Sequence, residues 1–124
     1  MSPAAPLRLY SYPQCSTCRK ALQWLSERGL TPAAGLELVD ITQTPPSLAE
    51  LATALSGVGR KRLFNTSGQS YRALGSATVA AMDDATALKA LAADGKLIKR
   101  PFAITASGAV LVGFKPDEWS AALG

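Results

Sequence analysis

The stretch that decides the fold runs over residues 7–29 and reads LRLYSYPQCSTCRKALQWLSERG. Its beginning, Leu7 to Tyr12, alternates apolar and polar side chains until Pro13, a pattern typical of a strand that ends in a loop. From Ser16 onward the apolar residues recur at three- and four-residue spacing, and Gly29 follows where a helix commonly ends. The stretch therefore predicts a strand, a short loop carrying two cysteines, and a helix with one buried face.

The rest of the chain alternates in the same way between strand and helix patterns. We expect first a strand over 36–41, then a helical stretch that is opened by Pro45-Pro46-Ser47 and runs to Gly57. Short helical turns rather than strands follow over 57–81, and then a helix that is preceded by Asp83-Asp84 and closed by Gly95. The chain ends with a hairpin of strands 101–105 and 109–112 around Ala106-Ser107-Gly108, and a last helix from Pro116. This order predicts an α/β, thioredoxin-like (glutaredoxin-like) fold, with a mixed sheet flanked by helices and a helical insertion.

Length and composition narrow the classes of protein to which the chain can belong. Its 124 residues suit one domain over 1–124, and 48% apolar against 18% charged residues can fill a core. The net charge of +4 is too small to indicate nucleic-acid binding by itself. No apolar run suggests a membrane span or a secretory leader, so we expect a cytoplasmic protein.

The cysteines point to chemistry rather than to structure. The chain has two, Cys15 and Cys18, and a disulfide between them would close too small a loop to stabilise the fold much. There is no histidine, which removes Cys-His catalysis and leaves too few soft ligands for a structural zinc, so we expect no metal site. The alternative, two inert core cysteines, explains neither the spacing nor the position at a helix start.

The position of Cys15 before a helix favours its thiolate. Unpaired amide groups and the positive end of the helix dipole lower the pKa of a cysteine from about 8.5 to roughly 3.5–7.5 in such settings. Cys18 follows one turn later and lies deeper. We therefore expect Cys15 to be the nucleophile and Cys18 the resolving cysteine of a thiol–disulfide reaction. Arg19 and Lys20 either support the thiolate or are ordinary solvated cations.

Four segments resemble the arsenate reductase (ArsC)/Spx superfamily, in particular its CxxC-bearing, arsenate reductase-like branch. They are Tyr12 to Ala21, Leu63 to Gly68 with Tyr71-Arg72, Leu97 to Pro101, and Val112 to Lys115. The resemblance implies that Cys15 is the reactive cysteine, that Arg100 and Pro101 lie beside it as substrate-binding residues, and that Pro101 is cis. An arginine there could give an oxyanion or a carboxylate two parallel hydrogen bonds.

One departure from the family pattern bears on the substrate. The glutaredoxin-linked arsenate reductases hold arsenate with three arginines, whereas here only Arg100 has a counterpart, and Asn65 and Gly113 stand at the other two positions. Losing two cations removes most of the charge-assisted hydrogen bonding available to a dianion. Arsenate is therefore a doubtful substrate, unless Arg60, Arg62 or Arg72 takes over; the alternative for these three is a solvated basic surface.

Two functions remain open from the sequence. The first is a cytosolic thiol–disulfide oxidoreductase that binds no cofactor and is reset by an external thiol reductant, glutathione with glutaredoxin or thioredoxin. Its partners would be a thiol or disulfide substrate and the reductant protein, with no membrane and no direct nucleic-acid contact. The alternative is a Spx-type redox-sensing transcriptional regulator, which would bind the RNA polymerase α subunit instead of turning over a substrate.

Overall fold

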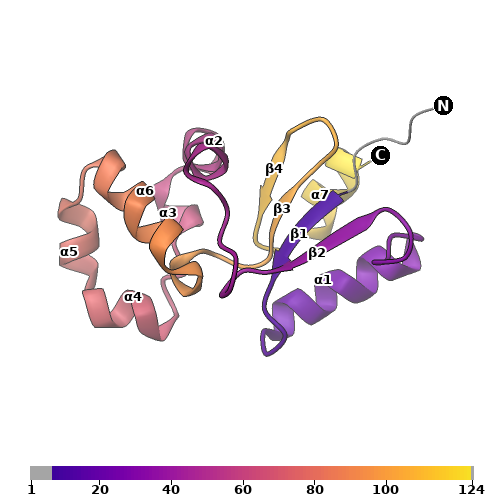
Figure 1. Cartoon of the computed structure of the whole chain (residues 1–124), viewed down its shortest axis with the longest axis horizontal. Coiled ribbons are helices and arrows are strands. Elements are labelled where there is room, and N and C mark those ends of the chain that lie inside the picture. Colours follow the sequence, from indigo (N-terminus) through magenta and orange to yellow (C-terminus); the bar gives the residue numbers. More distant parts are fainter. Residues whose placement is uncertain (1–6, 124) are drawn as a thin grey trace. The chain divides into compact units, whose positions relative to one another are not determined.

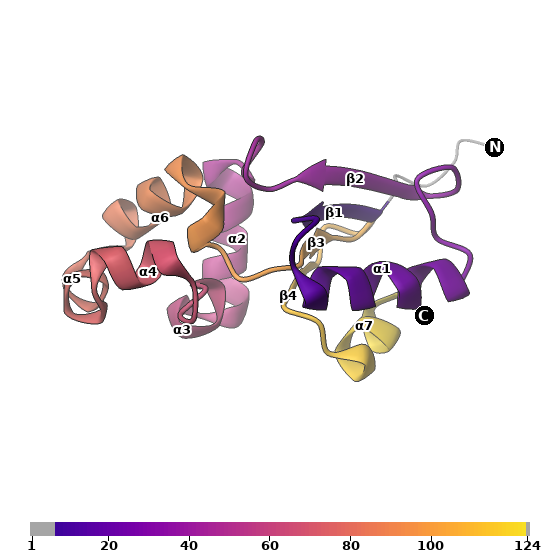
Figure 2. The same cartoon turned by 90° about the horizontal axis from the view of Figure 1, so that it is seen from below.

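The computed structural model describes residues 7–123, which divide into two compact units. Unit 1 comprises residues 7–40 and 100–123, and unit 2 comprises residues 41–99. Figure 1 shows both units, and Figure 2 shows them after a 90° turn about the horizontal axis. That the chain forms one domain stays a prediction from the sequence.

Unit 1 is a four-stranded mixed sheet with two helices. Its elements are β1 (Leu7–Ser11), α1 (Ser16–Glu27), β2 (Leu36–Asp40), β3 (Phe102–Ile104), β4 (Val110–Val112) and α7 (Pro116–Leu123). The strand order is β2-β1-β3-β4, in which β2 runs parallel to β1 while β3 and β4 are antiparallel to their neighbours. The strands and helices that the sequence predicts for this unit are thus confirmed.

The two helices of unit 1 cover one face of its sheet (Figure 2). The side chains that meet there form a buried core made of Leu7, Leu9, Leu36, Ala103 and Leu111 from the strands and Ala21, Leu25 and Trp119 from the helices. Helix α1 ends at the predicted glycine: Gly29 has φ 84°, its amide donates to Ser26, and the amide of Leu30 donates to Leu25. These two bonds satisfy carbonyls that would otherwise be unpaired at the helix end.

Unit 2 is the helical insertion between β2 and β3. It contains α2 (Leu48–Val58), α3 (Arg60–Leu63), α4 (Gln69–Leu74), α5 (Ser76–Ala81), α6 (Asp84–Ala93) and the one-turn 3₁₀ helix η1 (Gly95–Leu97). The short helices over 57–81 and the helix start at Asp83, whose side chain accepts from the amide of Thr86, are as predicted. Helix α2 begins with a reciprocal cap between Ser47 and Glu50.

Gly95 has a different role from the one that we expect from the sequence. It does not end α6, because Asp94 takes the cap position and Gly95 begins η1. The residue is a glycine because a β-carbon there would overlap the carbonyl oxygen of Ile41. Close approach of two backbone segments, rather than helix termination, therefore explains this glycine.

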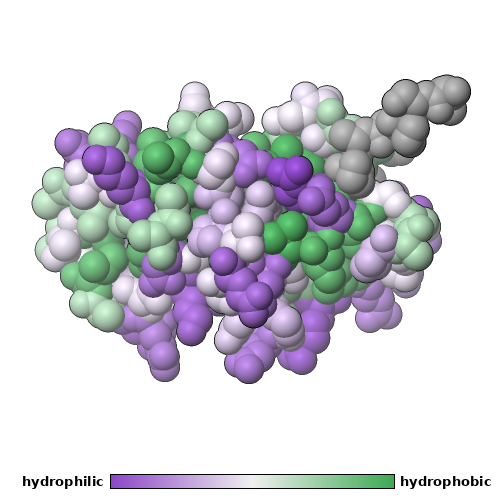
Figure 3. Space-filling model, in the orientation of Figure 1, coloured by the Kyte–Doolittle hydropathy of each residue, from purple (hydrophilic) through white to green (hydrophobic). Residues whose placement is uncertain are grey.

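Within residues 7–123, no helix is both long enough and apolar enough to cross a membrane. The region of β2 shows a hydrophobic patch on the surface (Figure 3), and Leu38 on this edge strand is 45% exposed. The edge of the sheet next to α1 is therefore only partly covered.

Candidate active site

Cys15 is the N-cap residue of α1. Its backbone is extended, with φ −88° and ψ 117°, and its Sγ accepts a hydrogen bond from the amide of Cys18 at 3.3 Å. The loop before it is fixed by a bond from the Cys15 amide to the carbonyl of Tyr12 at 3.0 Å. The N-cap side chain is usually that of Ser or Asp, whose oxygen accepts a hydrogen bond. Here a sulfur takes that place and accepts from a backbone amide that has no carbonyl partner within the helix.

Several contacts decide the protonation of Cys15. Partial burial opposes its ionisation and is the largest single effect, but it is outweighed by hydrogen bonds from the side chain and amide of Cys18, by the charge of Arg100 and by the amide of Thr17, so that the pKa of Cys15 is lowered. Hydrogen bonds and an opposite charge favour the ionised form of an acid. The balance shifts Cys15 towards thiolate.

Cys18 lies one turn further into the same helix and is fully buried. Burial raises the pKa of Cys18 to about 11, helped by the neighbouring Cys15 sulfur and opposed by bonds from the Tyr12 backbone and the Ser11 side chain. Both cysteines are free thiols in this structure. The two sulfurs therefore differ in acidity: half-buried Cys15 is shifted towards the thiolate, and buried Cys18 towards the thiol.

Arg100 and Pro101 stand directly before β3, which pairs with β1 through Tyr10 and Phe102. The Arg100–Pro101 peptide bond is cis, as the resemblance implies. The Arg100 guanidinium lies 5.0 Å from the centre of the Tyr12 ring, a cation–π contact that orients it, and its charge acts on Cys15. Unit 1 thus brings the four predicted site residues, Cys15, Cys18, Arg100 and Pro101, to one end of the β1–β3 pair.

The two positions that lack the family's arginines have structural contacts of their own. Gly113 has φ 73°, its amide donates to Pro101, and its carbonyl accepts the indole N–H of Trp119 at 2.9 Å. Buried Asn65 donates its amide to Leu97 and accepts a bond from the Ser67 hydroxyl. Both residues are therefore used to shape the backbone.

Arg60 is occupied in the same way. Its guanidinium donates to the carbonyls of Val79 and Met82, at 3.2 and 2.6 Å, and bonds Asp84 at 2.6 Å. It joins α3 to the end of α5 and the start of α6, which is a structural role. Arg62 is half-buried on α3, and Arg72 is exposed on α4. None of the three belongs to the unit that carries the cysteines.

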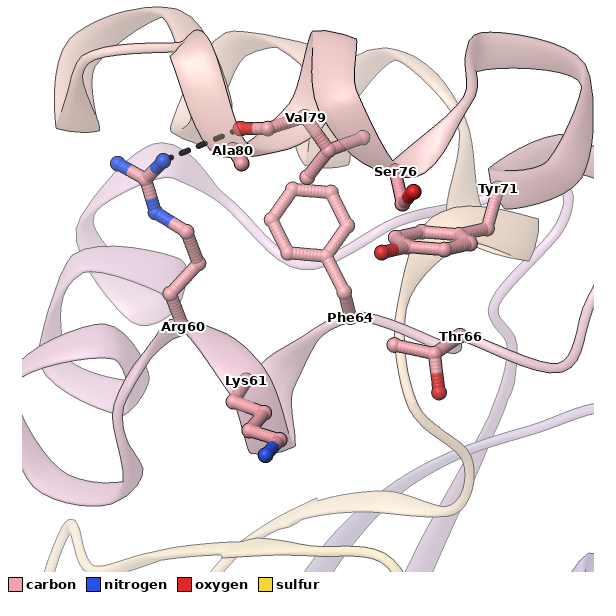
Figure 4. A pocket seen from close by; sticks show the side chains of 8 residues that line it. All are labelled: Arg60, Lys61, Phe64, Thr66, Tyr71, Ser76, Val79 and Ala80. Atoms are coloured by element: carbon pink, nitrogen blue, oxygen red, sulfur yellow. Dashed lines mark hydrogen bonds between the residues drawn. The ribbon is translucent and has the colours of Figure 1, made fainter.

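Each unit contains a pocket. That of unit 1, of about 490 Å³, lies where α1 faces the ends of the first two strands and is lined by Ser11, Pro13, Arg19, Leu22, Leu38, Val39 and Asp40. That of unit 2, of about 240 Å³, has Phe64 at its centre beside Tyr71, Ser76 and Val79, while Arg60 turns towards the Val79 carbonyl (Figure 4). Within the described part of the chain, no three His, Cys, Asp or Glu side chains gather where they could hold a metal ion.

Ser11 and Tyr12 are contacts that the sequence analysis did not single out. Ser11 touches the Cys18 thiol, and Tyr12 holds both the Cys15 amide and the Arg100 guanidinium. A signal for Ser11 was present, because the alternation of β1 puts it on the same face as Leu7 and Leu9, towards the helix that carries the cysteines. Nothing in the sequence pairs Tyr12 with Arg100, which are far apart in the chain.

Comparison with known proteins identifies the family. The ArsC family model matches residues 10–122. The uncharacterized protein YusI of Bacillus subtilis is 43% identical over 117 residues, covering 91% of this chain and 94% of its own. An arsenate reductase of Neisseria meningitidis is 31% identical over 110 residues, covering 86% and 89%.

Solved structures agree with this result. A Bacteroides fragilis protein related to the ArsC family superposes with a TM-score of 0.83 at 38% identity, over 96% of this chain and 98% of that one. The likeness spans both units, and it confirms the thioredoxin-like fold with its mixed sheet, flanking helices and helical insertion. A family match over nearly the whole length and relatives above 30% identity leave one assignment: the chain belongs to the ArsC family.

Proposed function

We propose that the protein is a thiol–disulfide oxidoreductase in which Cys15 is the nucleophile and Cys18 the resolving cysteine. The observation that carries the proposal is the contrast between two sulfurs one helical turn apart: Cys15 caps α1 with a lowered pKa, while buried Cys18 keeps its proton. Kinship with proteins named arsenate reductase supports thiol chemistry in general.

The first step uses the sulfur of half-buried Cys15. The Cys15 thiolate attacks one sulfur of a substrate disulfide, a new S–S bond forms, and the old one breaks to release the other half as a thiolate. The Cys18 amide, 3.3 Å from Sγ, holds the attacking atom, and Arg100 is placed to pair with an anionic group on the substrate. Cys18 does not compete for the substrate at this stage because it is protonated and buried.

The second step uses the buried sulfur. Cys18 loses its proton and attacks Sγ of Cys15, so a Cys15–Cys18 disulfide forms while the mixed disulfide breaks and the second substrate thiol leaves. Two electrons have then passed from the cysteine pair to the substrate. An external reductant then reduces the Cys15–Cys18 disulfide back to two thiols. It is either a dithiol protein, such as thioredoxin, or two molecules of glutathione acting with glutaredoxin. Arsenate is a weaker candidate because Asn65 and Gly113 have backbone roles where two arginines would be needed.

The test is turnover by the purified chain and by its Cys15→Ser and Cys18→Ser variants, with a low-molecular-weight disulfide, a glutathionylated peptide and arsenate as substrates. Each donor system is supplied in turn. We expect disulfide turnover by the wild type, none by Cys15→Ser, and a single stalled mixed disulfide, visible by mass spectrometry, in Cys18→Ser. The two variants remove one sulfur each and therefore serve as controls for one another.

The same assays can also contradict the proposal. If the wild type turns over no substrate with any donor and Cys15 titrates as an ordinary thiol, the enzyme proposal fails. Redox-dependent co-purification with the RNA polymerase α subunit would then support the Spx-type alternative. Efficient arsenate turnover would keep the enzyme but correct its substrate.

A further inference from the structure

The pocket of unit 1 is connected to Cys18 through one of its lining residues, Ser11. Its wall is mostly apolar, with Leu22, Leu38 and Val39 among its residues, and its polar groups include Ser11 and Asp40. Ser11 is itself almost fully buried and is hydrogen-bonded through its side chain to the Cys18 thiol. A cavity wall therefore touches the sulfur that is otherwise closed off from solvent.

Ser11 and Asp40 are neighbours across two strands. They are register partners at the ends of the parallel pair β1 and β2. Side chains of partners in adjacent strands share one face of the sheet, and here both residues line the same cavity on the side of α1. The chain thus places a thiol, a hydroxyl and a carboxylate in sequence: Cys18 to Ser11 by a hydrogen bond, Ser11 to Asp40 by strand pairing.

The proposed reaction needs such a group. A thiol is a poor nucleophile, so Cys18 must lose its proton before it attacks the mixed disulfide. The chain has no histidine, the usual base for this purpose. Among the described residues, the carboxylate of Asp40 is the acidic side chain that lines the cavity behind Cys18.

We propose that Ser11 and Asp40 form the proton exit of Cys18, with the Ser11 hydroxyl as the relay and Asp40 as the acceptor. The inference rests on the proposed function, since it concerns the second step of that reaction. The Ser11 hydroxyl, which as a donor to the sulfur lowers the pKa of Cys18, first rotates to donate to the Asp40 carboxylate. The proton of Cys18 Sγ then passes to the Ser11 oxygen while the hydroxyl proton passes to Asp40. The Cys18–Cys15 bond forms, the bond to the substrate sulfur breaks, and the leaving thiolate takes a proton from water. Asp40 then returns its proton to solvent through the cavity.

Other charged groups face this pair. Arg19 of α1 lines the same cavity, and Cys15, with Arg100 acting on it, adjoins Cys18. Charge alone gives Asp40 the opposite effect from a proton acceptor, because a nearby carboxylate disfavours a thiolate. If only electrostatics operated, removing the charge of Asp40 would speed up the second step; if Asp40 accepts the proton, removing it slows that step.

The two steps can be timed separately with a chromogenic nitrobenzoate disulfide. The first equivalent of coloured thiolate appears when Cys15 attacks, and the second when Cys18 displaces the bound half. We expect Asp40→Asn and Ser11→Ala to leave the first phase unchanged and to slow the second at neutral pH by roughly 10- to 100-fold, the lower range of general acid–base contributions. Ser11→Thr keeps the hydroxyl and should restore the second phase.

Glu37→Gln provides the matched control, because Glu37 is on the same strand but pairs with Arg8 at 3.1 Å. The dependence on pH separates proton transfer from damage to the fold. Hydroxide can take the proton when the pH is high, so the rates of the second phase in wild type and Asp40→Asn should converge above about pH 10. A variant that merely distorts the site stays slow at every pH.

The failures of the two proposals look different. If the wild type releases one equivalent and no second phase exists, the resolving role of Cys18 fails and the proposed function with it. If both phases occur and Asp40→Asn is as fast as Glu37→Gln, or faster, the function stands and the proton exit through Asp40 is wrong. Circular dichroism of each variant shows whether it is folded.

Discussion

The amide nitrogen of Cys18 lies 3.3 Å from Sγ of Cys15, so each cysteine of the pair acts on the other. The amide stabilises negative charge on Cys15, and that charge in turn helps to keep Cys18 protonated. Two cysteines one helical turn apart thereby have shifts of opposite direction in their pKa values. This difference in acidity depends on α1 beginning at Ser16, because the amides of a helix's first turn have no backbone carbonyl to bond and are free to bond a side chain.

Arg100→Gln should raise the pKa of Cys15. The arginine is one of the groups that lower this pKa, so removing its charge disfavours the thiolate and the pKa rises. The ultraviolet absorbance of the thiolate, followed during a pH titration, measures the shift.

Arg28→Gln is the matched control for this experiment. Arg28 also lies over an aromatic ring, at 3.9 Å from the centre of Trp24, but it stands at the other end of α1. Its loss should leave the titration of Cys15 unchanged. An equal shift in both variants would mean that net charge, rather than the position of Arg100, sets the pKa.

The reduced protein should lose stability as the pH rises above about 9. Cys18 has a raised pKa of about 11 when folded, against 9.0 as a reference, so its thiol ionises more easily in the unfolded chain. Its contribution is therefore complete below pH 9 and disappears as the pH passes through 11, with a size on the order of 2 kcal/mol.

Urea unfolding at pH 8 and at pH 10.5, in wild type and Cys18→Ser, checks this prediction. The difference between the two proteins should shrink at the higher pH, since serine does not ionise in this range. A difference that is constant with pH would show that Cys18 ionises equally in the folded and unfolded chains.

Much of unit 1 could be predicted because its signals are local. The alternation from Leu7, the change to helical spacing at Ser16 and the glycine at position 29 are separate patterns that agree with one another. The CxxC position at a helix start follows from the same stretch. The position of Asp40 opposite Ser11, in the wall of the same pocket, could not be seen this way, because it depends on the register of two strands that are far apart in sequence.

Unit 2 shows where local patterns mislead. Gly95 follows a helical pattern and has the sequence context of a helix end, yet its conformation is decided by Ile41, which comes some fifty residues earlier. Arg60 is part of a basic trio typical of a solvated surface, and its actual partners are carbonyls at the end of another helix. Tertiary contact overrides the local interpretation at both positions.

Gly95→Ala should therefore destabilise the protein. The added β-carbon overlaps the carbonyl oxygen of Ile41, so a backbone segment must move, and overpacking of this kind costs roughly 1–3 kcal/mol or somewhat more. Gly57→Ala is the control: that glycine is helical, nothing lies near its missing β-carbon, and alanine should stabilise α2 by up to about 1 kcal/mol. Opposite shifts of the urea midpoint are expected, and shifts of the same sign would contradict the close contact.

Arg60→Met should destabilise the protein by about 2 kcal/mol, because it leaves the carbonyls of Val79 and Met82 and the carboxylate of Asp84 without their donor. Methionine keeps the apolar stem, so the loss reports the hydrogen bonds rather than the packing. Arg72→Met, on the exposed surface of α4, should be within about 0.5 kcal/mol of the wild type. If Arg60→Met unfolds like the wild type while binding of arsenate weakens, then Arg60 holds an anion and its role in joining three helices is secondary.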